Sequence, residues 1–145
     1  MKKLLSLAVA LSVFVPAMSQ ELPLTISRLE VKYNDETIKV DEPIERKIRE
    51  DEKSDVLIYE KDGYKYMTRF EYFRSNNRVK MTAKNFVEKP DGKRIYGKTK
   101  KYVQFIKVDI PGQFEEQMSE QIVIDKQQFK RMTASYKYTI KYAYN

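Results

Sequence analysis

The C-terminal stretch TASYKYTIKYAYN, residues 133–145, decides the fold class. Apolar side chains occupy the even positions from Tyr136 to Tyr144, and Lys137, Thr139 and Lys141 lie between them. Alternation with a period of two is typical of a β-strand that buries one face. The stretch therefore predicts a strand whose tyrosines, with Ile140, pack into a core; a binding face for a sugar ring or a protein partner fits the same pattern.

The same alternation recurs towards the N-terminus, with turn sequences such as Asp62-Gly63 between the segments. The clearest further segments are 29–33, 56–60, 64–72 and 79–87. Closely spaced strands of this kind predict a single all-β domain, an antiparallel β-sandwich of about seven to eight strands. An up-and-down lipocalin-like barrel fits the same consecutive hairpins and stays open as the alternative.

Two segments suggest short helical turns. The stretch 41–54 is rich in charge and has Ile44 and Ile48 four residues apart, which favours one or two turns of helix. Asp125 and Gln128 have the spacing of a capping box, which favours a single turn over 127–132. Ordered loops fit both segments equally well.

The N-terminus has the pattern of a secretory signal peptide. Lys2 and Lys3 precede the apolar run 4–15, and Ala17-Met18-Ser19 supplies small residues for cleavage before Gln20. The run is shorter than the roughly 20 residues that span a bilayer. The sequence therefore predicts a cleaved signal over 1–19, a single domain over 20–145, and a periplasmic or secreted protein without a membrane span.

Composition narrows the chemistry more than any motif does. The 145-residue chain has no histidine and no cysteine, which excludes histidine-dependent triads, thiol nucleophiles and histidine-ligated metal sites. Neither a nucleophile elbow nor a phosphate-binding loop occurs among its four glycines. We therefore expect a protein that is not an enzyme, with no catalytic residues, no cofactor and no metal.

Net charge gives a mild preference for acidic partners. The chain has 28 basic and 21 acidic residues, a net charge of +7, and loss of two signal lysines lowers this to about +5. Export removes most nucleic acid from reach, so we expect no nucleic-acid partner. An acidic protein or an anionic glycan fits both the charge and the compartment.

Basic side chains alternate with the aromatic side chains along several strands. If those strands are neighbours, the basic residues form a cationic sheet face that binds a partner. The predicted residues are Lys65, Arg69, Lys80, Lys84, Lys137 and Lys141. A solvated face that discourages edge-to-edge aggregation accounts for the same pattern.

Two functional classes follow from these features. The first is an exported, non-enzymatic interaction domain of a bacterial envelope or exterior that recognises a protein or glycan, with inhibitors and immunity proteins as specific roles. The second is a carrier of a small ligand inside a lipocalin-like barrel. A packed interior favours the first class, and an open cavity favours the second.

Overall fold

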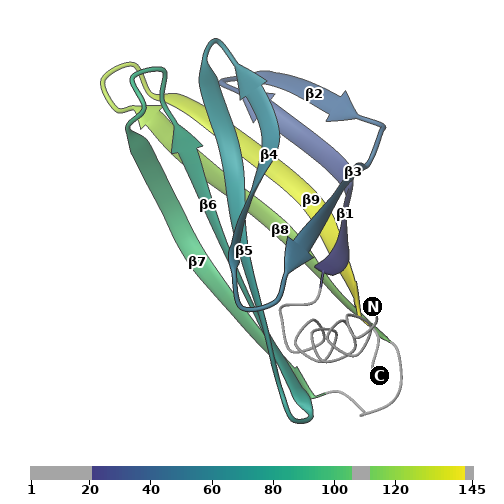
Figure 1. The fold of residues 1–145 in the computed structure, drawn as a ribbon. Helices are drawn as coiled ribbons and strands as arrows, with labels where there is room; N and C mark the ends of the chain where they lie inside the picture. The colour runs from purple at the N-terminus through teal and green to yellow at the C-terminus, as the bar shows by residue number, and fades with distance from the viewer. Residues whose placement is uncertain (1–20, 106–111, 143–145) are drawn as a thin grey trace, which may run out of the picture.

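The protein folds into two antiparallel β-sheets that pack face to face (Figure 1). The computed structural model describes residues 21–105 and 112–142, so the predicted signal peptide lies outside the described residues. Sheet 1 has the order β2-β1-β9-β8, and β3 also pairs with β1. Its strands are β1 (Glu21–Tyr33), β2 (Glu36–Val40), β3 (Ile44–Arg49), β8 (Gly112–Asp125) and β9 (Lys130–Tyr142).

Sheet 2 is a four-stranded meander in the order β4-β5-β6-β7. Its strands are β4 (Lys53–Lys61), β5 (Tyr64–Ser75), β6 (Arg78–Glu88) and β7 (Arg94–Phe105). The predicted Asp62-Gly63 turn joins β4 to β5, and both of its residues have positive φ, 52° and 84°. The sandwich prediction is confirmed. The barrel alternative is wrong, because the strands form two separate sheets and not one closed sheet.

The described chain has nine strands, slightly more than predicted, because one edge of sheet 1 is divided in two. β2 pairs with residues 29–33 of β1, and β3 pairs with residues 21–26 of the same strand. Pro43 lies between them and has no amide hydrogen to donate to a ladder. Neither segment that was expected to form helical turns does so. Residues 41–54 contain β3 and the start of β4, and residues 127–132 contain a turn and the start of β9.

A β-bulge in β1 keeps the apolar side chains of this strand in the core. Leu22, Leu24 and Ile26 are buried at even positions, whereas Leu29 and Val31 are buried at odd positions. The pairing with β9 shifts between Ser27 and Glu30, which is where the parity changes. The extra residue, Arg28, is exposed and has a φ of 54°.

The core consists mainly of the aromatic strand faces that the alternation predicts. Tyr66, Phe70 and Tyr72 of β5 are fully buried and face Tyr138 and its neighbours on β9. The rings of Phe70 and Tyr138 meet edge to face, with centroids 5.2 Å apart. The prediction that the tyrosines of these strands are core residues is confirmed for Tyr66, Tyr72, Tyr136, Tyr138 and Tyr142, whereas Tyr64 is partly buried and Tyr144 lies outside the described residues.

A polar network crosses this core from one sheet to the other. Tyr136 donates to Thr68 at 2.7 Å, because Thr68 uses its single hydrogen to donate to Asn85 Oδ1 at 2.6 Å. Asn85 Nδ2 then donates to Glu120 Oε1 at 2.8 Å, and the Lys98 amide donates to Glu120 Oε2 at 2.6 Å. Each polar side chain of this network therefore has a hydrogen-bond partner, as a buried polar group requires.

Candidate functional site

Four of the six predicted basic residues lie together on the outer face of sheet 2. Lys65 and Arg69 belong to β5, and Lys80 and Lys84 belong to β6. Arg69 and Lys84 are direct cross-strand partners, so their side chains share one face. The opposite face of the same strands is the buried aromatic core.

The other two predicted residues lie elsewhere. Lys137 and Lys141 are on β9 in sheet 1, whose outer face points away from sheet 2. The Lys137 ammonium also forms an ion pair with Glu115 at 3.2 Å. The six residues therefore do not form one surface, because β5–β6 and β9 belong to opposite layers of the sandwich.

The outer face of sheet 2 also exposes apolar side chains that the sequence analysis missed. Leu57, Met67, Phe86 and Tyr96 form one row across the four strands. Phe73 and Val103 flank Lys80 in a second row. The exposed fractions are 38% for Leu57, 48% for Tyr96, 55% for Val103 and 73% for Phe105. A signal for them existed: Phe73 and Phe86 each directly adjoin core residues, which breaks the period of two.

Phe86 is the centre of a cluster on this outer face. Only 1% of Phe86 is exposed, although its side chain points away from the core. The guanidinium groups of Arg69 and Arg94 lie 5.6 Å and 4.8 Å from the centroid of its ring. The Tyr96 ring packs beside it at 5.5 Å. These contacts form a small second core outside the sandwich interior.

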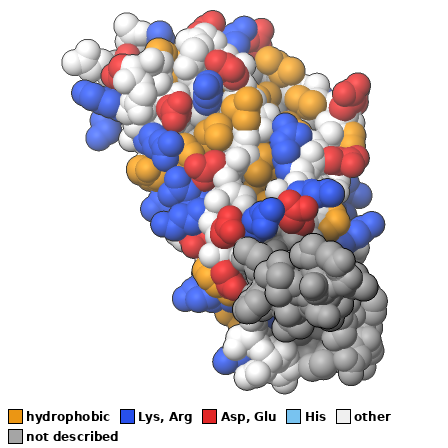
Figure 2. Space-filling view, in the orientation of Figure 1, with side chains coloured by type: hydrophobic (Ala, Val, Ile, Leu, Met, Phe, Trp, Pro, Cys, Tyr) orange, Lys and Arg blue, Asp and Glu red, His pale blue; other side chains and the backbone are white. Residues whose placement is uncertain are grey.

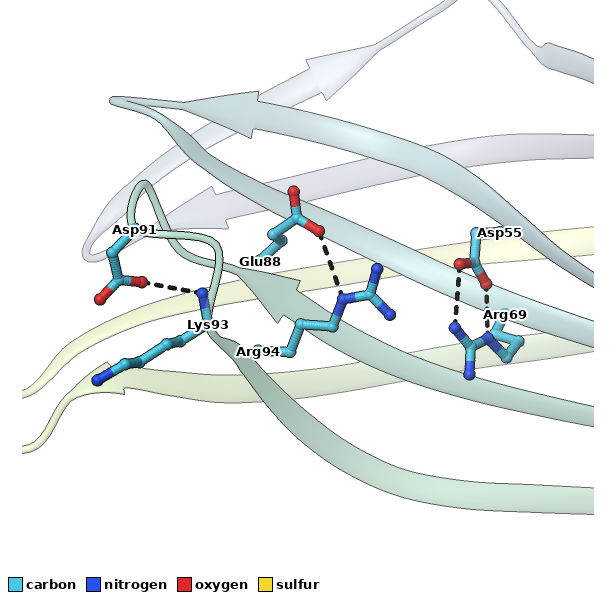
Figure 3. A network of polar contacts seen from close by, with 6 residues as sticks. All are labelled: Asp55, Arg69, Glu88, Asp91, Lys93 and Arg94. Carbon is cyan, nitrogen blue, oxygen red and sulfur yellow. Dashed lines mark hydrogen bonds and ion pairs between the residues drawn. The ribbon is translucent and has the colours of Figure 1, made fainter.

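Carboxylates hold both arginines in place (Figure 3). Asp55 accepts two hydrogen bonds from Arg69, at 2.7 Å and 3.1 Å, and Glu88 pairs with Arg94 at 3.4 Å. The hydrogen bonds to Asp55 raise the pKa of Arg69 above its ordinary value. Bidentate geometry of this kind fixes the guanidinium plane and so keeps the arginine over the phenyl ring.

Further cations cover the two remaining aromatic rings. The Lys80 ammonium lies 5.1 Å from the Phe73 ring centroid, and the Lys84 ammonium lies 4.9 Å from that of Tyr96. Phe73 and Lys80 also line a groove of about 310 Å³ with Ser75, Arg78 and Val103. Apolar walls and basic rims therefore lie next to each other on this surface.

The outer face of sheet 1 has a different chemistry. Its strands β8 and β9 present hydroxyl and amide side chains, as in the cross-strand pair Ser119 and Ser135, whose oxygens are 2.7 Å apart. Four of the six large hydrophobic side chains exposed among the described residues, Leu57, Tyr96, Val103 and Phe105, lie on sheet 2; Ile38 lies on the edge strand β2 and Phe129 in the turn between β8 and β9. Figure 2, in which sheet 2 lies nearer the viewer, shows hydrophobic and basic side chains interspersed. Exposed apolar area adjoining positive charge is typical of an interaction surface.

The described residues supply little for metal or redox chemistry. Over 21–105 and 112–142, no cluster of three or more histidine, cysteine, aspartate or glutamate side chains has the geometry to hold a metal ion. The same residues contain no helix of the length and apolarity that crossing a bilayer needs. Comparison of the chain with protein-family models, curated proteins and solved structures finds no match.

Proposed function

We propose that this chain is an exported, non-enzymatic binding domain that recognises an acidic surface of a partner protein through the outer face of sheet 2. The observation that carries the proposal is the pairing of exposed apolar side chains with basic ones across neighbouring strands of that face. Among the described residues, Lys65, Lys80 and Lys84 have no ion-pair partner there. Free positive charge accelerates association, while the apolar rows supply area that is buried on binding.

The cations that cover the aromatic rings favour a protein partner over a glycan partner. A sugar ring stacks on an open aromatic face, but Lys80 and Lys84 lie over the rings of Phe73 and Tyr96. Phe86 is closed off by Arg69 and Arg94. Carboxylate side chains of a protein fit beside these cations without displacing them. The carrier alternative depended on a closed barrel, and two separate sheets remove that support.

Paired charge reversals test the surface. We expect Lys80→Glu with Lys84→Glu to abolish capture of partners from an extracytoplasmic extract. The control reverses two exposed lysines of sheet 1, Lys47 and Lys141, which gives the same change in net charge. Equal loss in both double variants would show that capture depends on overall charge and not on this face.

Two treatments identify the class of partner and the role of charge. Protease treatment of the extract should remove the captured material, whereas digestion of polysaccharide should leave it; the reverse result would make the partner a glycan. Once the captured partner is purified, association should slow steeply with salt, because exposed charges are screened over about 10 Å at 0.1 M ionic strength.

Export is part of the same proposal. Ala17-Met18-Ser19 follows the apolar run, so mature protein from the native host should begin at Gln20. Mass spectrometry of the N-terminus provides the measurement. Cytoplasmic protein that retains Met1 would exclude an extracytoplasmic partner.

A further inference from the structure

A hollow on sheet 1 gathers positive charge from three strands. It has a volume of about 380 Å³ and lies against β8, β9 and the bulge of β1. Its polar lining consists of Arg28, Lys100, Gln117, Ser119, Ser135 and Lys137. Lys100 comes from β7, so both sheets contribute a cation. The outer face of sheet 2 shares none of these residues.

The bulge in β1 is what brings Arg28 to this hollow. Ile26 points into the core, so without the bulge residue 28 would also point inward. The inserted residue places Arg28 outside and returns Leu29 to the core. The bulge places backbone strain on Arg28, whose φ of 54° lies in a region that glycine and asparagine adopt more readily than other residues. Bulges commonly re-aim a side chain towards a functional site.

Most of the positive charge in the hollow is uncompensated. Neither Arg28 nor Lys100 forms an ion pair with any described residue, and Glu115 compensates only Lys137. Three cations close enough to line one hollow repel each other, and a bound anion would relieve this repulsion. An arginine fork and two ammonium groups also differ in geometry, which suits an anion with several oxygens.

The two serines add neutral donors to the same site. Ser119 and Ser135 are cross-strand partners with their oxygens 2.7 Å apart. One hydroxyl donates to the other, so the second keeps its hydrogen free for a ligand. The Gln117 amide supplies further donors beside them.

We propose that this hollow, the Arg28 hollow, binds a tetrahedral oxyanion, the phosphate or sulfate group of an ester. The arginine fork, the two ammonium groups and the free serine hydroxyl come from a lining of four different strands and supply more donors than the two oxygens of a carboxylate can use, which suits an anion with four oxygens. The hollow is larger than a bare ion needs, and the ester's organic portion fills the rest. This inference is independent of the proposed function, because none of its residues lies on the outer face of sheet 2.

Titration calorimetry of the mature chain with inorganic phosphate and inorganic sulfate tests the site, in dilute chloride buffer. We expect saturable binding at one site, with acetate binding more weakly. Arg28→Gln and Lys100→Gln should each weaken binding about tenfold, the usual effect of losing one charge-assisted hydrogen bond. Glycerol phosphate and a glucose sulfate then distinguish the two kinds of ester.

Matched controls separate a site from general attraction. Lys101→Gln removes the same charge from the neighbouring residue of β7, and Lys141→Gln does so on β9 beyond the hollow. Both should bind phosphate and sulfate like the unaltered protein. Absence of saturable binding, or equal weakening in all four variants, would overturn the proposal.

One further variant separates an effect on folding from an effect on oxyanion binding. Arg28→Gly removes the cation and also relieves the positive φ. We expect its denaturation midpoint to rise while oxyanion binding falls. If binding survives in this folded variant, Arg28 is not a ligand and the proposal fails.

Discussion

The carboxylate of Glu120 fills the space in which a side chain at Gly97 would begin. A Cβ at residue 97 would lie 2.5 Å from Glu120 Oε2 and 2.7 Å from Oε1, well inside contact distance. Gly97 sits in a second β-bulge, where the pairing of β6 with β7 shifts between Lys84 and Phe86. A single carboxylate thus ties the β8 edge of sheet 1 to the bulged edge of sheet 2.

This relationship predicts strong coupling between the two residues. Gly97→Ala should cost about 1–3 kcal/mol, because the new methyl group expels a carboxylate that two hydrogen bonds anchor. With Glu120→Ala already present, the same change should cost much less. Urea unfolding of the four variants measures the coupling as a double-mutant cycle.

Gly92→Ala provides the control for that cycle. Gly92, unlike Gly97, has a positive φ, 87°, and no atom lies within 4 Å of a Cβ placed there. Its substitution should cost about 1 kcal/mol through backbone conformation alone, with or without Glu120. Additive costs for Gly97 and Glu120 would show that the carboxylate moves aside freely.

Two neighbouring core tyrosines should respond differently to loss of their hydroxyls. Tyr136 donates to Thr68 within the polar network, so Tyr136→Phe should destabilise the fold by about 1 kcal/mol. The Tyr138 hydroxyl is buried without a hydrogen-bond partner among the described residues, so Tyr138→Phe should be neutral or stabilising. Denaturant midpoints of both variants decide the matter, and a larger loss for Tyr138 would contradict it.

The core was predictable because its signal is local. Alternation along 64–72 and 133–145 identifies the buried faces directly, since neighbouring side chains of a strand point to opposite sides. The first half of β1 was missed, because the Arg28 bulge divides its apolar positions into even and odd sets. β3 was missed because an edge strand rich in charge has the composition of a solvated helix.

The surfaces were less predictable because they depend on which strands share a sheet. Lys84 and Lys137 have the same pattern in sequence, yet they lie in different sheets. Alternation tells which face a side chain occupies within its strand and says nothing about the neighbouring strands. The Arg28 hollow was also not predictable, because its lining combines β1 with β7, β8 and β9, which lie at the other end of the sequence.

Alkaline pH should unfold the protein in a way that reports on the buried tyrosines. Burial raises the pKa of the Tyr66, Tyr136 and Tyr138 hydroxyls above the ordinary value of 10.0. Above that pH the unfolded chain releases protons that the folded chain keeps, so stability falls as pH rises. Each such tyrosine contributes a slope of about 1.4 kcal/mol per pH unit.

Urea unfolding between pH 8 and pH 11, values typical for tyrosine titration, measures this slope. Stability should be nearly constant below the ordinary tyrosine pKa, and the tyrosinate absorbance of Tyr66, Tyr136 and Tyr138 should appear together with unfolding. Tyr138→Phe should reduce the slope by one proton. Ionisation of these tyrosines in a chain that stays folded would contradict the prediction.

The last prediction concerns Phe86, which separates structure from binding on the outer face of sheet 2. Phe86 is buried beneath two arginines and Tyr96, so Phe86→Ala should destabilise the fold by about 2–4 kcal/mol. The cost stays below that of the largest core substitutions, because Arg69 and Arg94 can partly fill the cavity. Phe105→Ala is the matched control, because 73% of Phe105 is exposed and its loss should cost less than about 0.5 kcal/mol. Partner capture should fall with Phe105→Ala if the apolar rows are buried on binding, even though stability is unchanged. Equal stability of the two variants would show that Arg69 and Arg94 do not enclose Phe86 in solution, and the outer cluster would then be free to open for a ligand.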